Sequence, residues 1–118
     1  MTKILVADDD TVMLNLLTTL MQLEGNEITT VTRPAEIMPA VERERPDLIM
    51  MDFHLAGGDV METLVDLRSR EELASIPVLV ASGMDHETAC LNAGADGFIL
   101  KPFRPTQLLE RIHELLGG

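Results

Sequence analysis

The sequence predicts an α/β fold in which a five-stranded parallel sheet is doubly wound, with helices on both faces. Residues 3–7 and 47–52 contain continuous apolar runs without polar alternation, which is typical of strands buried on both faces. Segments with helical spacing of their apolar residues follow the predicted strands in regular alternation. Repeated βα units of this kind imply right-handed crossovers and therefore a parallel sheet.

Residues 3–7 form the first predicted strand, and a helix follows it directly. Either Asp10 or Thr11 can cap this helix, and Gly25 suits its left-handed end. Apolar residues recur through the helix at helical spacing, so one face should be buried. The expected buried face consists of Met13, Leu16, Leu17, Leu20 and Leu23.

The second βα unit contains a proline within its helix. Residues 27–32 alternate Thr with apolar residues and are expected to form a more peripheral strand. The helix is expected between Pro34 and Arg45. Pro39 should kink it or delay its start, because an internal proline removes one hydrogen bond. Residues 47–52 then form the third strand.

The second half of the chain continues the alternation. Residues 53–59 are expected to form a loop without regular structure, because they include two adjacent glycines. Helices are predicted at residues 60–70, 87–93 and 106–116, and strands at residues 76–81 and 97–100. The inward face of the last helix is expected to carry Leu108, Leu109, Ile112, Leu115 and Leu116.

The length and the net charge limit the classes of protein to which this sequence can belong. At 118 residues, the whole chain, 1–118, is expected to be one domain. With 9 basic and 20 acidic residues and a net charge of −11, the domain is not expected to bind nucleic acid directly. No apolar run suggests a signal peptide or a membrane span. The single cysteine, Cys90, favours a reducing compartment, and we expect the protein in the cytoplasm.

Polar side chains follow four of the five predicted strands, at the point where each strand ends. Asp8 and Asp9 follow the first strand, Asp52 the third, Ser82 the fourth and Lys101 the fifth. Because the carboxyl ends of parallel strands meet at one edge, these side chains should converge. Clustered carboxylates need a counter-charge, which Mg²⁺ with oxygen ligands supplies. Asp52 is then placed to attack a phosphoryl donor, helped by Lys101 and Ser82.

These residues, in this order and at these strand ends, resemble the receiver domains of two-component response regulators. Residues 94–103, GADGFILKPF, are also similar to the family's fifth-strand signature. The resemblance implies a flavodoxin-like strand order, 2-1-3-4-5, and a phosphorylation switch. A sensor histidine kinase or phosphotransfer protein would be the phosphoryl donor. The surface of the fourth helix, fifth strand and fifth helix would then control a downstream protein or output domain, and a phosphorylation-dependent dimer is a further expectation.

The resemblance also implies the metal ligands and the acceptor. Asp52 is expected to accept the phosphoryl group and to bind Mg²⁺. Asp9 would bind Mg²⁺ directly and Asp8 mainly through water, and the backbone carbonyl of His54 would be a further ligand. The peptide bond between Lys101 and the proline after it is expected to be cis.

A second group of residues is expected to respond to the phosphoryl group. The resemblance implies that Lys101 contacts it, that Ser82 is the hydroxyl of the switch, and that Phe98 is the rotating aromatic coupled to Ser82. The resemblance also places His54 over the acceptor, and Met84, two residues after Ser82, would flank it from the other side. We expect these two side chains to hinder attacking water and to prolong the phosphorylated state.

Three positions depart from the family's pattern. Ala56 stands where the loop after the acceptor usually carries proline, and Val60 replaces a glycine common at the start of the third helix. Phe98 replaces the usual tyrosine and cannot donate a hydrogen bond on rotating. These departures concern the loop and the output coupling, and they leave the acidic residues intact.

Other chemistries have weaker support. The three histidines share no metal-binding spacing and are expected at the surface: His54, His86 and His113. The absence of Trp and Tyr disfavours a flavin site, and His54 stands where a haloacid-dehalogenase-like phosphatase needs a second aspartate. One alternative stays open, an unphosphorylated receiver-like interaction module. Catalysis is expected to be limited to the chain's own phosphorylation and slow dephosphorylation at Asp52.

Overall fold

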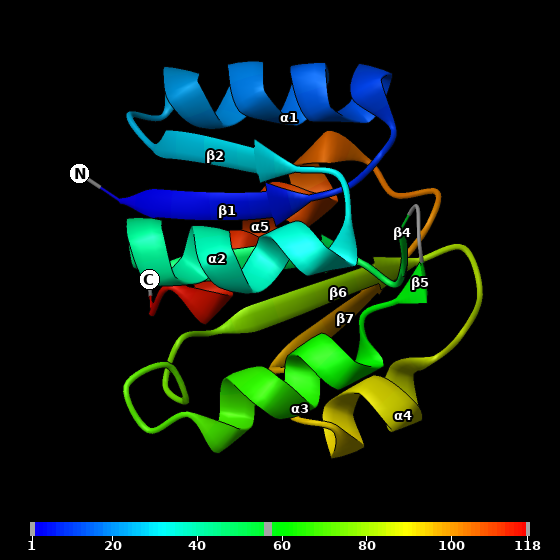
Figure 1. Cartoon of the computed structure of the whole chain (residues 1–118). Coiled ribbons are helices and arrows are strands. Elements are labelled where there is room, and N and C mark those ends of the chain that lie inside the picture. Colours follow the sequence, from blue (N-terminus) through cyan, green and yellow to red (C-terminus); the bar gives the residue numbers. More distant parts are fainter. Residues whose placement is uncertain (1, 56–57, 118) are drawn as a thin grey trace.

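The computed structural model describes residues 2–55 and 58–117 and contains the predicted parallel sheet (Figure 1). Its five strands are β1 (Lys3–Ala7), β2 (Glu27–Val31), β3 (Leu48–Asp52), β6 (Val78–Ser82) and β7 (Gly97–Leu100). They are ordered β2-β1-β3-β6-β7, which is 2-1-3-4-5 for the strands of this sheet in chain order. The predicted fold class and strand order are therefore confirmed.

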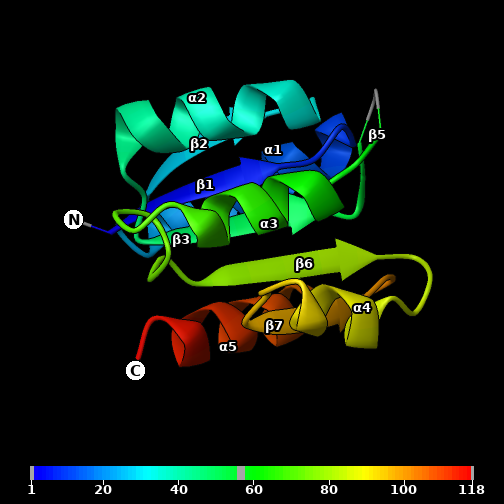
Figure 2. The ribbon, with the colours of Figure 1, turned by 60° about the horizontal axis from the view of Figure 1, so that its bottom comes forward.

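Five helices cover the two faces of the sheet. They are α1 (Thr11–Leu23), α2 (Pro34–Glu44), α3 (Met61–Ser69), α4 (Glu87–Asn92) and α5 (Pro105–Leu115). Helices α1 and α5 lie on one face, and α2, α3 and α4 lie on the other (Figures 1 and 2). None of the described helices is long and apolar enough to cross a membrane.

The core consists of two layers, one on each face of the sheet. Successive side chains of a strand point to opposite faces, so Ile49 of β3 packs with α2 and α3 whereas Met50 packs with α1 and α5. Residues 48–51 are all buried. The absence of polar alternation in this strand therefore has a direct structural cause, since both of its faces are covered by helices.

The strands all end at one edge of the sheet. Every pairing among β1, β2, β3, β6 and β7 is parallel, with Ile49 of β3 opposite both Leu5 of β1 and Val78 of β6. In Figure 1 the arrowheads point to the right, away from the side where β1 begins and α5 ends. This arrangement brings the polar residues at the strand ends together.

Helix α1 buries a different face from the one predicted. Leu14, Leu17 and Met21 are buried, whereas Leu16 is 47% exposed and Leu23 is 80% exposed. The expected burial of Leu16 and Leu23 is therefore wrong. Because α1 carries apolar residues around most of its circumference, two stripes fit helical spacing, and only docking against the sheet selects one.

The caps of α1 and the start of α2 at Pro34 agree with the prediction. Asp10 caps α1 by accepting a hydrogen bond from the Met13 amide at 3.1 Å, and Gly25 adopts the left-handed conformation after the helix, with φ 87°. Helix α2 begins at Pro34 and continues through Pro39, so a delayed start, one of the two alternative effects expected of Pro39, is not observed. Pro39 lies on the exposed side of α2, where water can satisfy the carbonyl that its missing N–H leaves free.

The segment after β3 also differs from the prediction. Instead of an irregular loop, β4 (His54–Leu55) and β5 (Gly58–Asp59) pair as a short antiparallel hairpin, with His54 opposite Asp59. Backbone pairing is compatible with glycine, whose freedom allows Gly58 a φ of 145°. Ala56, where the family usually has proline, and Gly57 lie outside the described residues.

Candidate functional site

Three carboxylates lie together where β1 and β3 end. Asp8 and Asp9 follow β1, Asp52 ends β3, and one oxygen of each lies within 4.8 Å of the others. The Asp8 side chain is 1% exposed, whereas Asp9 is at the surface, so the cluster extends from the interior to solvent. The predicted convergence of these residues is therefore observed, and oxygen ligands in this arrangement suit a hard divalent cation.

Lys101 provides a positive charge inside this cluster. Its Nζ lies 3.2 Å from an Asp8 oxygen and 3.3 Å from an Asp52 oxygen. The Lys101 amide donates to the Ser82 carbonyl at 2.7 Å, which fixes the end of β7 beside β6. The peptide bond between Lys101 and Pro102 is cis, as predicted. One ammonium group faces three carboxylates here, so the site keeps a negative charge that a cation would offset.

The electrostatics of the site follow from this geometry. Burial raises the pKa of Asp52. The Lys101 ammonium opposes this rise, and the carboxylates of Asp8 and Asp9 add to it. Burial by itself would lower the pKa of Lys101, but the neighbouring carboxylates of Asp8 and Asp52 outweigh it and raise that pKa. The negative charge of Asp52 is thus costly even beside Lys101, and a second cation would reduce that cost.

The Ser82 hydroxyl lies at the end of β6 and accepts a hydrogen bond from the loop that follows. The side chain is 1% exposed, and its Oγ accepts a hydrogen bond from the Met84 amide at 3.1 Å. Gly83 has no neighbouring atom within 4 Å of the position that a Cβ would take, so there is open space beside it. Met84 is 64% exposed. Phe98 is buried in β7, opposite Val80 of β6.

Two of the three histidines are where the sequence predicts them, and one is not. His54 and His113 are exposed. His86 is half-buried, and its ring is stacked on Phe53 with a centroid distance of 4.0 Å and an interplanar angle of 11°. The predicted surface position of His86 is therefore wrong. No sequence spacing relates Phe53 to His86, so only the proximity of β3 to the β6–α4 loop reveals their contact.

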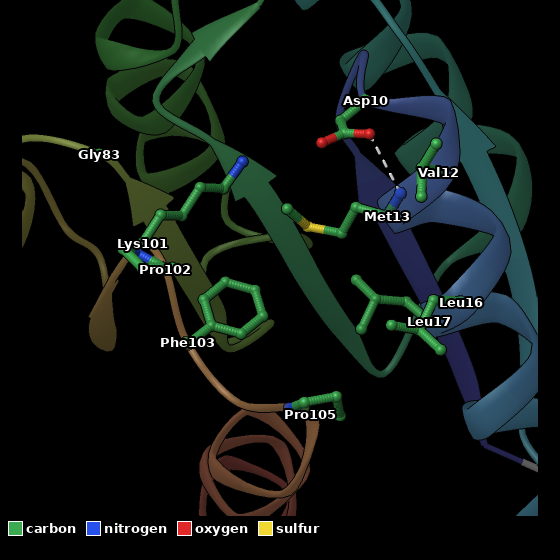
Figure 3. Close-up of a pocket in the computed structure, with 10 residues that line it drawn as sticks. All are labelled: Asp10, Val12, Met13, Leu16, Leu17, Gly83, Lys101, Pro102, Phe103 and Pro105. Carbon is green, nitrogen blue, oxygen red and sulfur yellow. Dashed lines mark hydrogen bonds between the residues drawn. The ribbon is translucent and has the colours of Figure 1, made fainter.

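An apolar groove of about 590 Å³ opens next to Lys101 (Figure 3). One wall is formed by α1, including Met13 and Leu16, and the other by Phe103 and Pro105 after β7. Figure 3 shows the Met13 side chain extending from α1 towards Phe103. The groove thus adjoins the lysine that contacts the Asp52 carboxylate, although no motif in the sequence indicates it.

The fold and the acidic edge together define a class of α/β protein with a carboxylate cluster at the ends of parallel strands. The response regulator receiver domain is the family whose model matches this chain, over residues 4–113. The chain therefore belongs to the response regulator receiver domains.

Individual relatives agree with this assignment. The chain is 34% identical over 115 residues to the transcriptional regulatory protein PrrA of Mycobacterium tuberculosis, covering 97% of this chain and 49% of PrrA. The chain thus spans about half the length of the curated relatives it matches.

Solved structures show the same fold. The BeF3-activated N-terminal receiver domain of RstA from Klebsiella pneumoniae superposes with a TM-score of 0.89 at 27% identity, covering 99% of this chain and 100% of that one. A CheY-like receiver domain protein from Methanospirillum hungatei JF-1 has a TM-score of 0.89 at 29% identity, with 98% and 94% covered.

Proposed function

We propose that this chain is a phosphorylation-dependent signalling switch in which Asp52 accepts a phosphoryl group from a sensor histidine kinase or a phosphotransfer protein. The observation that carries this proposal is the carboxylate cluster bridged by Lys101, with Nζ 3.3 Å from Asp52. An Asp52 oxygen would form a bond to phosphorus as the bond between phosphorus and the donor nitrogen breaks. Lys101 would neutralise charge on the transferred group, and the Ser82 hydroxyl would donate to one of its oxygens.

The residues of the site fit Mg²⁺. Asp8, Asp9 and Asp52 offer hard carboxylate oxygens, and we propose the His54 backbone carbonyl as a further ligand. Bound there, Mg²⁺ would neutralise charge on the phosphoryl oxygens. Asp8 already accepts hydrogen bonds from Lys101 and from the Asp10 amide at 2.9 Å, which supports its binding mainly through water while exposed Asp9 binds directly.

Incubation with acetyl phosphate and Mg²⁺, followed by intact-mass and peptide measurements, tests the proposal. We expect one phosphoryl adduct on Asp52 and none in Asp52→Asn. Omission of Mg²⁺ or the change Lys101→Ala should greatly reduce the yield. An unmodified Asp52 would instead favour the alternative function, an unphosphorylated receiver-like interaction module.

We propose that the side chains of His54 and Met84 prolong the lifetime of the phosphorylated state. His54 is exposed on β4, two residues after the acceptor, and exposed Met84 follows Ser82 by two residues. If these side chains hinder attacking water, dephosphorylation is faster in His54→Ala and Met84→Ala, whereas His113→Ala on α5 decays like the wild type. Equal decay rates in all four proteins would contradict this assignment.

The apolar groove is the proposed contact surface for the protein donor, because it adjoins Lys101 at the acceptor site. Leu16→Asp in the groove should slow phosphotransfer from a phosphorylated donor protein and leave the reaction with acetyl phosphate unchanged. Val65→Asp on α3 is the matched control, since Val65 is similarly exposed, at 57% against 47%, but lies outside the groove. Equal effects of the two changes would place the donor elsewhere.

We propose that phosphorylation changes the surface formed by α4, β7 and α5. Ser82 connects to α4 through four residues, and Phe98 lies in β7, so changes at the acceptor can reach this surface. We propose that this surface controls a downstream protein or an output domain and forms a phosphorylation-dependent dimer. The 118-residue chain would act as one receiver domain in the cytoplasm, without binding nucleic acid itself.

A further inference from the structure

The stack between Phe53 and His86 is a contact that the phosphoryl-transfer chemistry does not use. Phe53 directly follows Asp52, and His86 directly precedes α4, so the stack joins the acceptor strand to the start of that helix. The His54 ring contacts both partners edge-on, with centroids 4.7 Å from Phe53 and 5.7 Å from His86. These three ring contacts link β4 to the loop between β6 and α4.

The two sides of the stack are held by different backbone contacts, and the His86 carbonyl accepts from the Cys90 amide of α4 at 2.9 Å. The Phe53 backbone is anchored on both sides, because its amide donates to Ala81 at 2.7 Å and its carbonyl accepts from Val60 at 3.2 Å. His86 lies at the end of the loop that begins after Ser82, and Met84 in that loop donates to the Ser82 hydroxyl. The loop therefore connects the Ser82 hydroxyl to the ring of His86 within four residues.

A buried ring nitrogen of His86 makes the stacked arrangement less favourable. His86 Nε2 is buried and has no hydrogen-bond partner among the backbone and side-chain atoms that the structure describes, which leave out the side chain of Asp59. Burying a polar atom without a partner disfavours the stacked form, since the nitrogen would regain a hydrogen bond to water on release. The favourable ring contact is thus partly cancelled, which leaves a stack of small net strength.

We propose that His86 is a positioning residue, and that its stack on Phe53 holds the β6–α4 loop in the unphosphorylated arrangement. This inference rests on the proposed function. In this proposal the Ser82 hydroxyl moves towards a phosphoryl group on Asp52, and the loop that is hydrogen-bonded to it through the Met84 amide and carries His86 moves with it, against anchored Phe53. The stack therefore stabilises the form that binds the phosphoryl group less well, and weakening the stack shifts the population towards the form that binds it better.

The two ways of changing His86 have opposite expected effects. His86→Ala removes the ring together with the unpartnered nitrogen, so it should increase the affinity for a phosphoryl analogue by less than about twelvefold, the upper end of what aromatic pairs contribute. His86→Phe keeps a ring against Phe53 and removes the unpartnered nitrogen, so it should decrease that affinity. A purely structural role for His86 would not produce changes of opposite sign.

The test is calorimetric titration of the 118-residue protein with beryllium trifluoride, a phosphoryl analogue, at saturating Mg²⁺. His113→Ala is the matched control, because His113 is exposed on α5 and should leave the affinity unchanged. Wild-type binding with unchanged affinities in His86→Ala and His86→Phe would overturn the positioning role alone. A wild-type protein that neither binds the analogue nor accepts a phosphoryl group on Asp52 would overturn the proposed function, and this inference with it.

A second measurement needs no substitution. The ring protons of His86 should be shifted by the ring current of Phe53 in the free protein and should move towards unstacked values when beryllium trifluoride saturates the site. Unchanged His86 signals at saturation would show that the stack persists, which overturns the proposal even if His86→Ala fails to fold.

Discussion

Asp52 carries its negative charge at a cost in the folded protein, because its side chain is only 13% exposed and two other carboxylates are close. Burial raises the pKa of Asp52, so the folded state holds this proton more tightly than the unfolded state does. Stability then falls as the pH rises above the ordinary aspartate pKa, and the full cost is present above the raised pKa.

The first prediction is therefore that Asp52→Asn stabilises the metal-free protein at pH 7. We expect a gain of about 1 kcal/mol in the free energy of unfolding, an ordinary size for one substitution, and no gain at pH 3, where aspartate is protonated in both states. Thermal unfolding of the wild type and of Asp52→Asn at pH 7 and at pH 3 measures the gain in stability at each pH. Saturating Mg²⁺ should stabilise the wild type more than Asp52→Asn, and a destabilised variant at pH 7 would contradict this account.

The histidines also show what residue-level patterns can predict. His54 is next but one to Asp52, so its place beside the acceptor follows from the chain itself. His86 is 33 positions after Phe53 in the sequence, and nothing local indicates their stack. Side chains that follow directly from strand ends were thus predictable, whereas a contact between two loops depends on how those loops fold.

At the level of elements, α1 shows that helical spacing can leave the buried face undecided. Leu17 is 1% exposed and its neighbour Leu16 is 47% exposed. We predict that Leu17→Ala lowers the free energy of unfolding by roughly 2–5 kcal/mol, because it removes buried methyl groups and leaves a cavity. Leu16→Ala is the matched control and should change it by only about 0.5 kcal/mol. Denaturant unfolding of both variants checks the assignment, and equal losses would contradict it.

Glu36 stabilises the start of α2 through its charge. Its Oε1 accepts hydrogen bonds from the amides of Thr32 at 3.1 Å and Arg33 at 3.0 Å. The backbone hydrogen bond from Thr32 is the largest cause that lowers the pKa of Glu36. An acid with a lowered pKa in the folded state stabilises it above the unfolded pKa, and this contribution disappears as the pH falls through the folded pKa.

We therefore predict that Glu36→Gln melts at a slightly lower temperature than the wild type at pH 7, and that the difference vanishes near pH 3. Thermal unfolding across this range provides the measurement. Glu110→Gln, an exposed acid within α5, is the control. A difference for Glu36→Gln that is the same at all pH values would show that its charge is not involved.

At the scale of the whole molecule, Arg68 forms hydrogen bonds with several separate segments at the edge of the sheet opposite the acidic site. Its guanidinium donates to the carbonyls of Gly94 at 2.7 Å and Ile76 at 2.8 Å, and it pairs with Asp96 at 2.6 Å. Asp96 in turn accepts from the Val78 amide at 2.8 Å. One side chain of α3 thus fixes the segments that enter β6 and β7.

We predict that Arg68→Lys lowers the free energy of unfolding by roughly 1–3 kcal/mol, because an ammonium group cannot make this planar set of hydrogen bonds and leaves carbonyls unsatisfied. Chemical denaturation measures the loss. Arg104→Lys at an exposed position before α5 should have little effect. A loss no greater than that of the control would show that the network contributes nothing to stability.

The sequence by itself determined the parallel sheet, its order of elements and the residues at the strand ends. Continuous apolar runs in alternation with amphipathic helices are typical of strands covered on both faces, and the ends of parallel strands meet at one edge. Asp8, Asp9, Asp52 and Lys101 therefore had to converge. The tertiary structure alone decided which face of α1 is buried, where the groove opens and that His86 stacks on Phe53. These features depend on the docking of helices and loops against the sheet, for which local spacing allows more than one solution.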